Sequence, residues 1–367
     1  MKIALVVPGG VDRSGTDRVI PVLLALIRRL ASRHELHVYA LRQEDARGEW
    51  ELCGAQIHNV GTGCTRWRAL RAIRAEHRVA PFTLTQSFFS GSNGLIAVAA
   101  ARSLGVPSLV HVSGGEVVAI RIIGYGGRLS WKGRLREALV LRAATVVTAS
   151  SAPMVASLAA LGIRAQCVPL GVGVDDWPCR SPSPRAIPGT ARLVHVGSLN
   201  RVKDQSTLLQ AFALLATSRP GVHLDIVGVD TLHGEIQALA KSLNIADQIA
   251  FHGYLTQAHL RPIMEAAHIL VMSSRHEADP IVMLEAAMVG VPTVGTAVGR
   301  IAEWAPDAAL VAPVGDARGL ARLIESLLAD DQLRLRVAAA AQRRAMAEDA
   351  GHTARCFELI YAALGGF

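Results

Sequence analysis

The chain has 367 residues, more than one ordinary hydrophobic core accommodates, and this length favours two domains. Hydrophobic residues make up 51% of it and aromatic residues only 4%, so its cores should be aliphatic. Five scattered cysteines form no C-x-x-C pair, which argues against a disulfide framework and structural zinc and favours a reducing compartment.

The net charge of +8 is unevenly distributed along the chain. Residues 1–185 hold 23 of the 38 basic residues but only 12 of the 30 acidic ones. Basic and apolar residues alternate in two stretches of this half, Arg66–Arg78 and Leu129–Arg142. Such stretches can contact an anionic membrane surface, but solvated helix faces look the same, and both interpretations stay open. No nucleic-acid-binding motif accompanies the charge, so a nucleic-acid partner is not expected.

Short apolar runs alternate with amphipathic stretches through the first half. The apolar runs predict strands at Lys2–Val7, Leu36–Ala40, Thr83–Gln86, Ser108–Val112, Thr145–Ala149 and Gln166–Val168. The amphipathic stretches predict helices at Arg18–Arg33, Arg66–Arg78, Asn93–Ser103, Ser130–Ala143 and Ala152–Ala160. Strands that alternate with helices form a parallel sheet covered on both faces.

A stretch rich in Pro, Gly and Ser, at about Gly171–Thr190, predicts a linker. After it, strands are expected at Arg192–Val196, His223–Val227, Gln248–Phe251, Ile269–Met272, Thr293–Gly295 and Leu310–Ala312. Helices are expected at Asp204–Thr217, Leu232–Ser242, Gln257–Ala266, Pro280–Val289, Ala317–Ala329, Gln332–Ala347 and His352–Leu364.

The expected fold is therefore α/β, with two doubly wound Rossmann-like domains that face each other across a cleft. They comprise residues 1–170 and 191–350, and a helix within 351–367 could cross back to the first domain. The apolar run at the N-terminus is too short for a signal peptide, and no run suits a transmembrane helix. We expect a cytoplasmic protein, attached at most peripherally to the inner face of the membrane.

Two glycine-rich turns follow expected strands of the first domain. In PGGVDRSGTDRV (Pro8–Val19), glycines such as Gly10 and Gly15 would let the backbone approach a phosphate, although such loops also serve as plain turns. In PSLVHVSGGEV (Pro107–Val117), His111 shares a strand face with Ser113 and either lines a site or is a buried structural histidine. The G-x-G-x-x-G fingerprint follows neither domain's first strand, which counts against an NAD enzyme.

In VHVGSLNRVKDQ, Arg201 and Lys203 stand just before an expected helix. Cations at that end oppose the helix macrodipole. Their position makes sense if they surround an anion that the helix end also attracts. The alternative is ordinary solvated charge in a loop.

RHEADPIVMLEAAMVGVP (Arg275–Pro292) carries a single carboxylate, Glu285, within an otherwise apolar helix. A buried carboxylate is costly unless it is neutral or has a partner, and the partner could be a ligand. We expect Asp279 to cap this helix and Pro280 to occupy its first turn. The helix start would bind phosphate, and Glu277 and Glu285 would bind sugar hydroxyls on either side. That combination suits a sugar nucleotide; the alternative is a capped core helix with a chance glutamate.

The segment EADPIVMLEAAMVGVPTVGTAVG resembles the donor-binding segment of family 4 retaining glycosyltransferases, which have the GT-B fold. The resemblance implies that Glu277 contacts hydroxyls of the transferred sugar and that Glu285 contacts the nucleotide ribose. The backbone of Asp279, Pro280, Ile281 and Val282 would face the diphosphate and the sugar.

Other segments resemble motifs of the same family. Val194–Phe212 is similar to its V-G-R-L-x-x-x-K-G signature, with Gly197 in place, but Ser198 stands where an Arg is usual, so Arg201 could substitute for it. Gly228, Gly253 and Tyr254 match positions near the base and phosphate, and Glu303 matches the Glu of its G-G-x-x-E turn. In the first half, the resemblance implies donor-phosphate or acceptor roles for Gly10, Gly15, Arg18, His111, Ser113, Gly114 and Glu116.

These features predict a glycosyltransferase that moves a sugar, in first place from a UDP-sugar, to an acceptor hydroxyl, and the family resemblance implies retention of anomeric configuration. Arg201, Lys203 and Glu277 would carry the catalysis. The acceptor would be a glycan, a lipid-linked saccharide or a small molecule, as in the synthesis of cell-surface glycan, lipopolysaccharide or glycolipid. No D-x-D motif and no cluster with metal-ligand spacing occurs, so neither a metal nor another cofactor is expected. The alternatives are a GT-B sugar-nucleotide epimerase and a non-catalytic GT-B-like scaffold.

Overall fold

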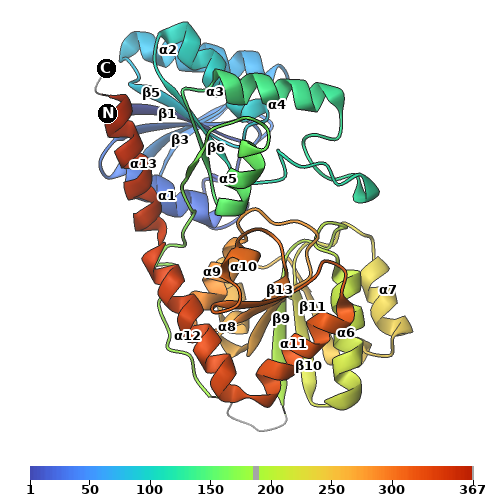
Figure 1. Cartoon of the computed structure of the whole chain (residues 1–367). Coiled ribbons are helices and arrows are strands. Elements are labelled where there is room, and N and C mark those ends of the chain that lie inside the picture. The colour runs from blue at the N-terminus through green and yellow to red at the C-terminus, as the bar shows by residue number, and fades with distance from the viewer. Residues whose placement is uncertain (185–189, 366–367) are drawn as a thin grey trace. The chain divides into compact units, whose positions relative to one another are not determined.

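The computed structural model describes residues 1–184 and 190–365. These form two compact units, shown in Figure 1. The first unit comprises Met1–Gly173 and the C-terminal segment that begins at Glu348, and the second comprises Val174–Ala347. Each unit is built around its own largely parallel sheet, which confirms the predicted α/β class with two Rossmann-like domains.

The sheet of the first unit reverses its strand order at β1. Its strands are β1 (Lys2–Val7), β2 (Glu35–Ala40), β3 (Gly48–Leu52), β4 (Ala55–Asn59), β5 (Leu84–Phe88), β6 (Ser108–Val112), β7 (Val146–Ala149) and β8 (Gln166–Cys167). They lie in the order β3-β4-β2-β1-β5-β6-β7-β8. After β1, the chain adds β2 and the β3–β4 hairpin on one side of β1. It then returns, and β5 pairs with β1 on the other side. In sheets of this kind, ligands bind beside the reversal, at the carboxyl ends of the strands.

The expectation of an all-parallel sheet is wrong at one edge. β3 and β4 form an antiparallel hairpin, with Leu52 paired to Ala55. Cys53 and Gly54 connect them with φ angles of 53° and 80°. Positive φ at both central residues gives a tight turn whose twist matches that of the strands it joins. Of the two turn residues, only Gly54 is of a type that favours positive φ, so the sequence analysis missed the hairpin.

Helices cover both faces of the first sheet (Figure 1). They are α1 (Pro21–Ala31), α2 (Thr65–Val79), α3 (Ser92–Leu104), α4 (Trp131–Ala143), α5 (Ala152–Ala159) and α13 (Ala350–Leu364). α3 packs against β1, β5 and β6, and α1 packs against α13. Thr353 Oγ1 donates to the Pro169 carbonyl at 2.8 Å, and the Tyr361 hydroxyl donates to Gln86. The C-terminal helix is thus part of the first unit.

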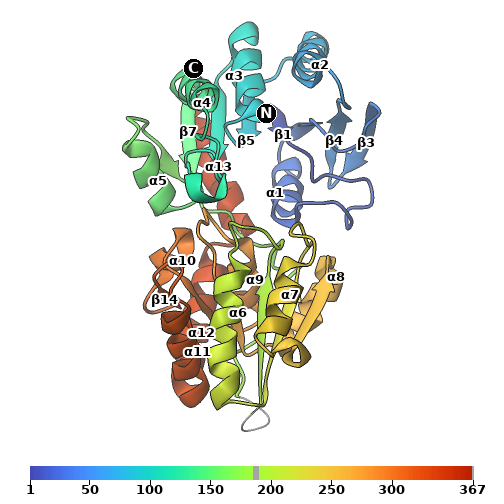
Figure 2. The same ribbon diagram turned by 90° about the vertical axis from the view of Figure 1, so that its right-hand side faces the viewer.

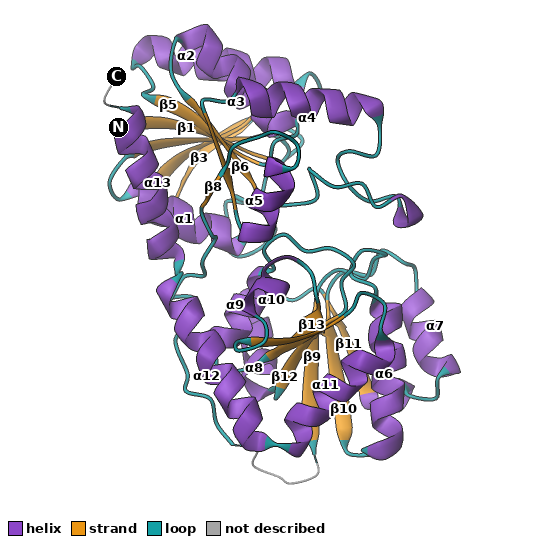
Figure 3. Ribbon diagram, in the orientation of Figure 1, coloured by secondary structure: helices purple, strands orange, loops and turns teal. Residues whose placement is uncertain are grey.

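The second unit repeats the same topology in a smaller sheet. β9 (Ala191–Val196), β10 (Val222–Val227), β11 (Ile249–Gly253), β12 (Ile269–Met272), β13 (Thr293–Thr296) and β14 (Ala309–Ala312) lie in the order β11-β10-β9-β12-β13-β14. All neighbouring strands are parallel, and Figure 3 draws them as orange arrows. The strand order reverses between β9 and β12, so a ligand site is expected beside the carboxyl ends of these two strands.

The helices of the second unit can be followed in Figure 2. They are α6 (Gln205–Ser218), α7 (Glu235–Ser242), α8 (Gln257–Ala266), α9 (Ile281–Met288), α10 (Gly299–Trp304), α11 (Ala317–Ala329) and α12 (Asp331–Ala347). Aliphatic residues of α6, α7 and α11 form one core cluster with the strands. Part of the predicted linker also belongs to this unit: Trp177 is fully buried and the Arg180 amide donates to the Met288 carbonyl. Residues 185–189 of that linker lie outside the described residues.

Within the described residues, no helix is both long enough and apolar enough to cross a lipid bilayer.

Candidate functional site

An ion pair joins the loop after β9 to the loop after β12, at the point where the strand order of the second unit reverses. Lys203, after β9, places its Nζ 2.6 Å from Oε1 of Glu277, which follows β12. The Ser274 hydroxyl donates to the same oxygen at 2.6 Å. The Lys203 and Glu277 side chains are 22% and 10% exposed, so the pair is largely shielded from water. Two residues predicted from separate motifs therefore meet at the carboxyl edge of the sheet.

The loop that carries Lys203 is held in place by polar contacts of its own. The Asn200 side chain accepts hydrogen bonds from the amides of Val202 and Lys203 at 3.1 and 3.0 Å. The Ser273 hydroxyl, after β12, donates to the Lys203 carbonyl at 2.8 Å. These hydrogen bonds hold the backbone from which the Lys203 side chain extends.

Arg201 lies in the same loop but points elsewhere. Its guanidinium contacts Glu235 of α7 at 2.9 Å, and both side chains are more than half exposed. The structure therefore does not bring Arg201 to the Lys203–Glu277 pair. A second cation, Arg275, lies beside this loop: its amide donates to the Val202 carbonyl and its guanidinium contacts Asp204 at 3.0 Å. The sequence analysis did not select Arg275, although it stands two residues before Glu277.

Glycines lie at the ends of β9, β10 and β11, and two of them, Gly197 and Gly228, are in close backbone contact. A Cβ on Gly228 would lie 2.1 Å from the Gly197 carbonyl oxygen, so a larger residue there would displace the neighbouring strand end. The Gly228 amide donates to the Gly253 carbonyl at 2.8 Å. Tyr254 follows Gly253 and is 55% exposed, so its ring is available to a ligand. The structure thus brings together Gly197, Gly228 and Gly253, with Tyr254 next in the chain, and their donor-binding roles stay predictions.

The start of α9 differs from the prediction. Pro280 is the residue before the helix, not part of its first turn, and Asp279 does not cap it. The Asp279 carboxylate instead forms a buried ion pair with Arg300 at 3.0 Å. Burial explains the difference, because a carboxylate without exposed surface needs a full counter-charge more than the helix needs a cap. The amides of Ile281 and Val282 remain at the helix start, where both residues are half-buried.

Glu285 is buried in α9, with 7% of its surface exposed. Gln257 donates to its Oε1 at 3.2 Å. Burial raises the pKa of Glu285 to about 7, although the side chains of Gln257 and Trp177 act in the opposite direction. The carboxyl group therefore lies between its neutral and charged forms near neutral pH, and in the part of the chain that the structure describes no cation forms an ion pair with it. A ligand that donates hydrogen bonds to it would stabilise the charged form.

Several polar groups of the Pro8–Val19 loop in the first unit are already hydrogen-bonded to other protein groups. Gln43 Oε1 accepts hydrogen bonds from the amides of Gly10 and Val11 at 2.7 and 2.9 Å. The Gly15 amide donates to the Asp12 carbonyl, and the Arg18 guanidinium pairs with the Asp12 carboxylate. A phosphate would have to compete with these contacts, and the ligand roles of Gly10, Gly15 and Arg18 stay predictions.

His111 of β6 lies in the core of the first unit. It has no exposed surface, its Nδ1 is 2.9 Å from the Thr148 hydroxyl, and the rings of Phe88 and Phe357 pack against it. Burial lowers its pKa to about 3. Of the two interpretations of this histidine, the structure favours the buried structural one.

The turn after β6 contains Ser113, Gly114 and Glu116, and the charge of Glu116 acts on a second carboxyl group, that of Glu137. Burial raises the pKa of Glu116, against hydrogen bonds from amides that include those of Ser90, Gly114 and Ser113. The Ser90 hydroxyl donates to Glu137 of α4 at 2.9 Å, and burial raises the pKa of Glu137 to about 7. The sequence analysis missed Glu137, because a lone glutamate on a basic helix predicts a solvated position.

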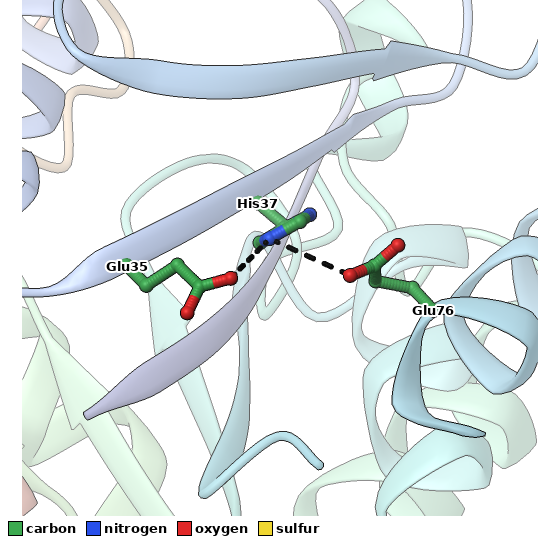
Figure 4. A group of neighbouring side chains, drawn as sticks. All are labelled: Glu35, His37 and Glu76. Atoms are coloured by element: carbon green, nitrogen blue, oxygen red, sulfur yellow. Dashed lines mark hydrogen bonds and ion pairs between the residues drawn. The ribbon is translucent and has the colours of Figure 1, made fainter. Parts of the chain in front are cut away.

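One cluster in the described residues has ligand atoms spaced closely enough for a metal: Glu35, His37 and Glu76, drawn in Figure 4. Lys2 already supplies a cation there, with Nζ 3.0 Å from Glu35 and 2.5 Å from Glu76. Burial alone would lower the pKa of Lys2, but its hydrogen bonds to Glu76 and Glu35 outweigh this and raise it. A metal ion would have to displace a tightly held ammonium group, so these residues fit a structural role better.

Two family profiles match the sequence. "Glycosyl transferases group 1" matches residues 182–344 and "Glycosyl transferase 4-like domain" matches residues 19–173. A curated relative, the lipopolysaccharide core biosynthesis glycosyltransferase LpsE of Rhizobium meliloti, is 34% identical over 149 residues, which is 40% of this chain and 42% of that protein. The chain thus spans less than half the length of the curated relatives it matches.

Two solved structures resemble the whole chain. Sucrose-phosphate synthase from Thermosynechococcus elongatus superposes with a TM-score of 0.84 at 19% identity, covering 99% of both chains. HepE of Anabaena, solved in complex with UDP-glucose, superposes with a TM-score of 0.78 at 17% identity, covering 99% of this chain and 100% of that one. At these identities the likeness concerns the fold.

The pKa of Glu285 predicts a pH-dependent stability. The native state holds this proton more tightly than the unfolded state, so the native state loses stability as pH rises from about 4.5 to about 7. Glu285→Gln removes that loss and should raise the free energy of unfolding by roughly 1–3 kcal/mol at pH 8 and by much less at pH 5. Chemical denaturation at both pH values measures it, with the exposed Asp247→Asn as control. Equal differences at the two pH values would contradict the shifted pKa.

Proposed function

The chain belongs to the group 1 glycosyltransferases and has the GT-B fold, and we propose that it transfers a sugar from a nucleotide-diphosphate sugar to an acceptor hydroxyl with retention of anomeric configuration. The observation that carries this proposal is the Lys203–Glu277 pair at the strand-order reversal of the second unit. It places a cation and a hydroxyl-binding carboxylate where doubly wound sheets bind ligands.

The donor site follows from the groups around this pair. The diphosphate lies against the Gly197 turn and the amides at the start of α9, where a helix terminus favours an anion. Glu285 accepts hydrogen bonds from the ribose hydroxyls, and Tyr254 stacks on the base. UDP is the preferred nucleotide because HepE, which shares the fold, binds UDP-glucose.

Charge on the leaving diphosphate is neutralised by protein groups in this proposal. Lys203 reaches the diphosphate once the donor sugar engages Glu277. Arg201 joins it from its exposed pair with Glu235, since an exposed ion pair contributes about 1 kcal/mol or less and opens readily. Electrostatic stabilisation of this kind substitutes for a metal ion. The acceptor hydroxyl attacks from the side of the leaving group, and the departing phosphate takes its proton, so no protein nucleophile is required.

The acceptor binds to the first unit, and an anionic membrane surface contacts the same unit through α4. Trp131, Leu135 and Leu139 lie four residues apart on α4 and are each more than half exposed. Exposed apolar side chains in one line, beside Lys132 and exposed arginines, suit a helix that lies at a lipid interface. The only carboxylate of α4, that of Glu137, is buried beneath this face. A cytoplasmic enzyme peripheral to the inner membrane face, acting on a lipid-linked saccharide or another cell-surface glycan precursor, fits these features.

Donor binding tests the proposal directly. A thermal-shift screen with UDP-, GDP- and ADP-sugars should identify one that raises the transition temperature, because a ligand of the native state stabilises it. Glu285→Ala should weaken binding of that sugar nucleotide at least about tenfold, since it loses hydrogen bonds to a charged group. The exposed Asp247→Asn is the control. Wild-type affinity in Glu285→Ala would exclude the ribose contact.

An epimerised donor formed without acceptor would favour the epimerase, and no binding to any sugar nucleotide would favour a non-catalytic scaffold.

Lys203 should matter more for turnover than for binding. Lys203→Ala should lower the rate of nucleotide release from the same donor about a hundredfold, because charge develops on the diphosphate in the transition state. Its dissociation constant for the donor should change about threefold or less. Lys203→Arg should recover part of the rate, and Lys241→Ala, an exposed lysine of α7, should match the wild type. An unchanged rate in Lys203→Ala would eliminate the charge role.

Liposome sedimentation tests the membrane contact. Vesicles with anionic phospholipid should retain the protein at low salt and release it as salt screens the charges, and neutral vesicles should not retain it. Leu135→Ser together with Leu139→Ser should weaken retention, because the variant removes apolar surface from α4 without altering its charge. Leu359→Ser on α13, also strongly exposed, is the matched control. Equal retention of both variants would place the contact elsewhere.

A further inference from the structure

The first unit has a cavity of about 710 Å³ that none of the predicted site residues lines. Its walls come from the carboxyl ends of β1 and β2, at Pro8, Leu41 and Arg42, and from the segments that begin α2 and α3. These elements flank the reversal of strand order between β1 and β5. The cavity, called here the Trp67 cavity, therefore occupies in the first unit the position where doubly wound sheets bind ligands.

The charge of the cavity is positive. Arg42 and Arg66 line it, and both are exposed, whereas its lining in the described residues includes no carboxylate. The Arg66 guanidinium donates to the Ser92 hydroxyl at 3.3 Å, which aims it across the cavity toward α3. Glu44, two residues after Arg42, is paired with another cation, Arg13, at 3.1 Å. Two guanidinium groups without an acid between them favour a ligand that carries phosphate or carboxylate.

Trp67 adds an apolar surface to this cationic site. Its ring is 60% exposed and lines the cavity, with the Arg71 guanidinium 5.3 Å from its centroid. A large exposed aromatic side chain commonly marks a contact surface. Sugar rings present one apolar C–H face and several hydroxyls, so an indole ring flanked by hydrogen-bond donors suits them.

Core packing and a hydrogen bond hold α2 and α3 beside the cavity. Ala69 and Ile73 of α2 are fully buried in a core cluster with Ile96, Ala97 and Ala100 of α3. Trp67 lies on the opposite face of α2, whereas Arg66, in the first turn, lies on the same side as Ala69 and Ile73 and reaches Ser92 of α3. Asn93, at the start of α3, donates to the Phe88 carbonyl at 2.7 Å and fixes the other wall.

We propose that the Trp67 cavity binds the acceptor and that this acceptor is a saccharide bearing a phosphate or a carboxylate. The inference rests on the proposed function for the role of the ligand as acceptor. Trp67 stacks on the apolar face of the sugar, and Arg42 and Arg66 bind its anionic group. A volume of this size accommodates more than one sugar unit, so the cavity can hold the end of an oligosaccharide.

The test uses the full chain labelled with 5-fluorotryptophan, with the Trp67 resonance assigned from Trp67→Phe. Glucose 6-phosphate, glucuronate, glucose and inorganic phosphate are titrated separately while ¹⁹F NMR follows that resonance. We expect at least one of the two anionic sugars to shift it saturably, at least about tenfold more tightly than glucose or phosphate alone. The two anionic sugars distinguish phosphate from carboxylate as the preferred group.

Arg42→Gln combined with Arg66→Gln should weaken that binding at least about tenfold, whereas Arg78→Gln, an exposed arginine of the same helix, should not. The proposal is overturned if neither anionic sugar shifts the Trp67 resonance, if glucose or phosphate alone binds equally well, or if the double variant binds as the wild type does. Calorimetry with the sugar nucleotides on the same samples separates the two hypotheses. Donor binding without a shift of the Trp67 resonance would contradict only the proposed acceptor site. A shift of that resonance without donor binding would contradict only the proposed transferase function.

Discussion

The contact between Lys203 and Glu277 depends on a topological constraint. β9 and β12 are neighbours in the sheet, but the chain builds outward to β11 before it returns to β12. The chain therefore leaves β9 and β12 in opposite directions along the sheet, and polar residues of the two following loops meet at the point of reversal. A lysine and a glutamate 74 positions apart meet there, 2.6 Å from each other. The glycines of β9 to β11 and the start of α9 are placed by the same sheet edge.

Glu285 illustrates the energetic cost of such a site. A buried carboxyl group that has hydrogen-bond donors but no cationic partner lowers the stability of the native state as it becomes charged. The neighbouring Asp279 shows the alternative arrangement, since its buried charge is matched by Arg300. Asp279 thus has a counter-charge, whereas no cation among the described residues forms an ion pair with Glu285. Functional sites commonly retain this kind of local instability.

The first unit concentrates the positive charge of the chain on two different surfaces. α4 shows an apolar line bordered by cations, which suits a lipid interface, and the Trp67 cavity shows arginines around a single exposed ring, which suits a small anionic ligand. Both stretches look alike in sequence, as alternating arginine and apolar residues. Packing separates them: α2 buries its alanine and isoleucine against α3, whereas α4 buries its only acid and leaves leucines exposed.

The sequence alone determined the fold class, the two-domain layout and the segment that contains Glu277 and Glu285, because hydrophobic periodicity and short motifs are local properties. It failed where the deciding interaction is distant in the chain. The hairpin of β3 and β4 depends on a left-handed turn at Cys53 and Gly54, and the role of Asp279 depends on Arg300. Likewise, the burial of His111 and Glu137 and the shape of the Trp67 cavity arise only when separate helices and strands pack together. Local patterns specify which elements form, but tertiary packing decides which side chains lose water and which partners they find.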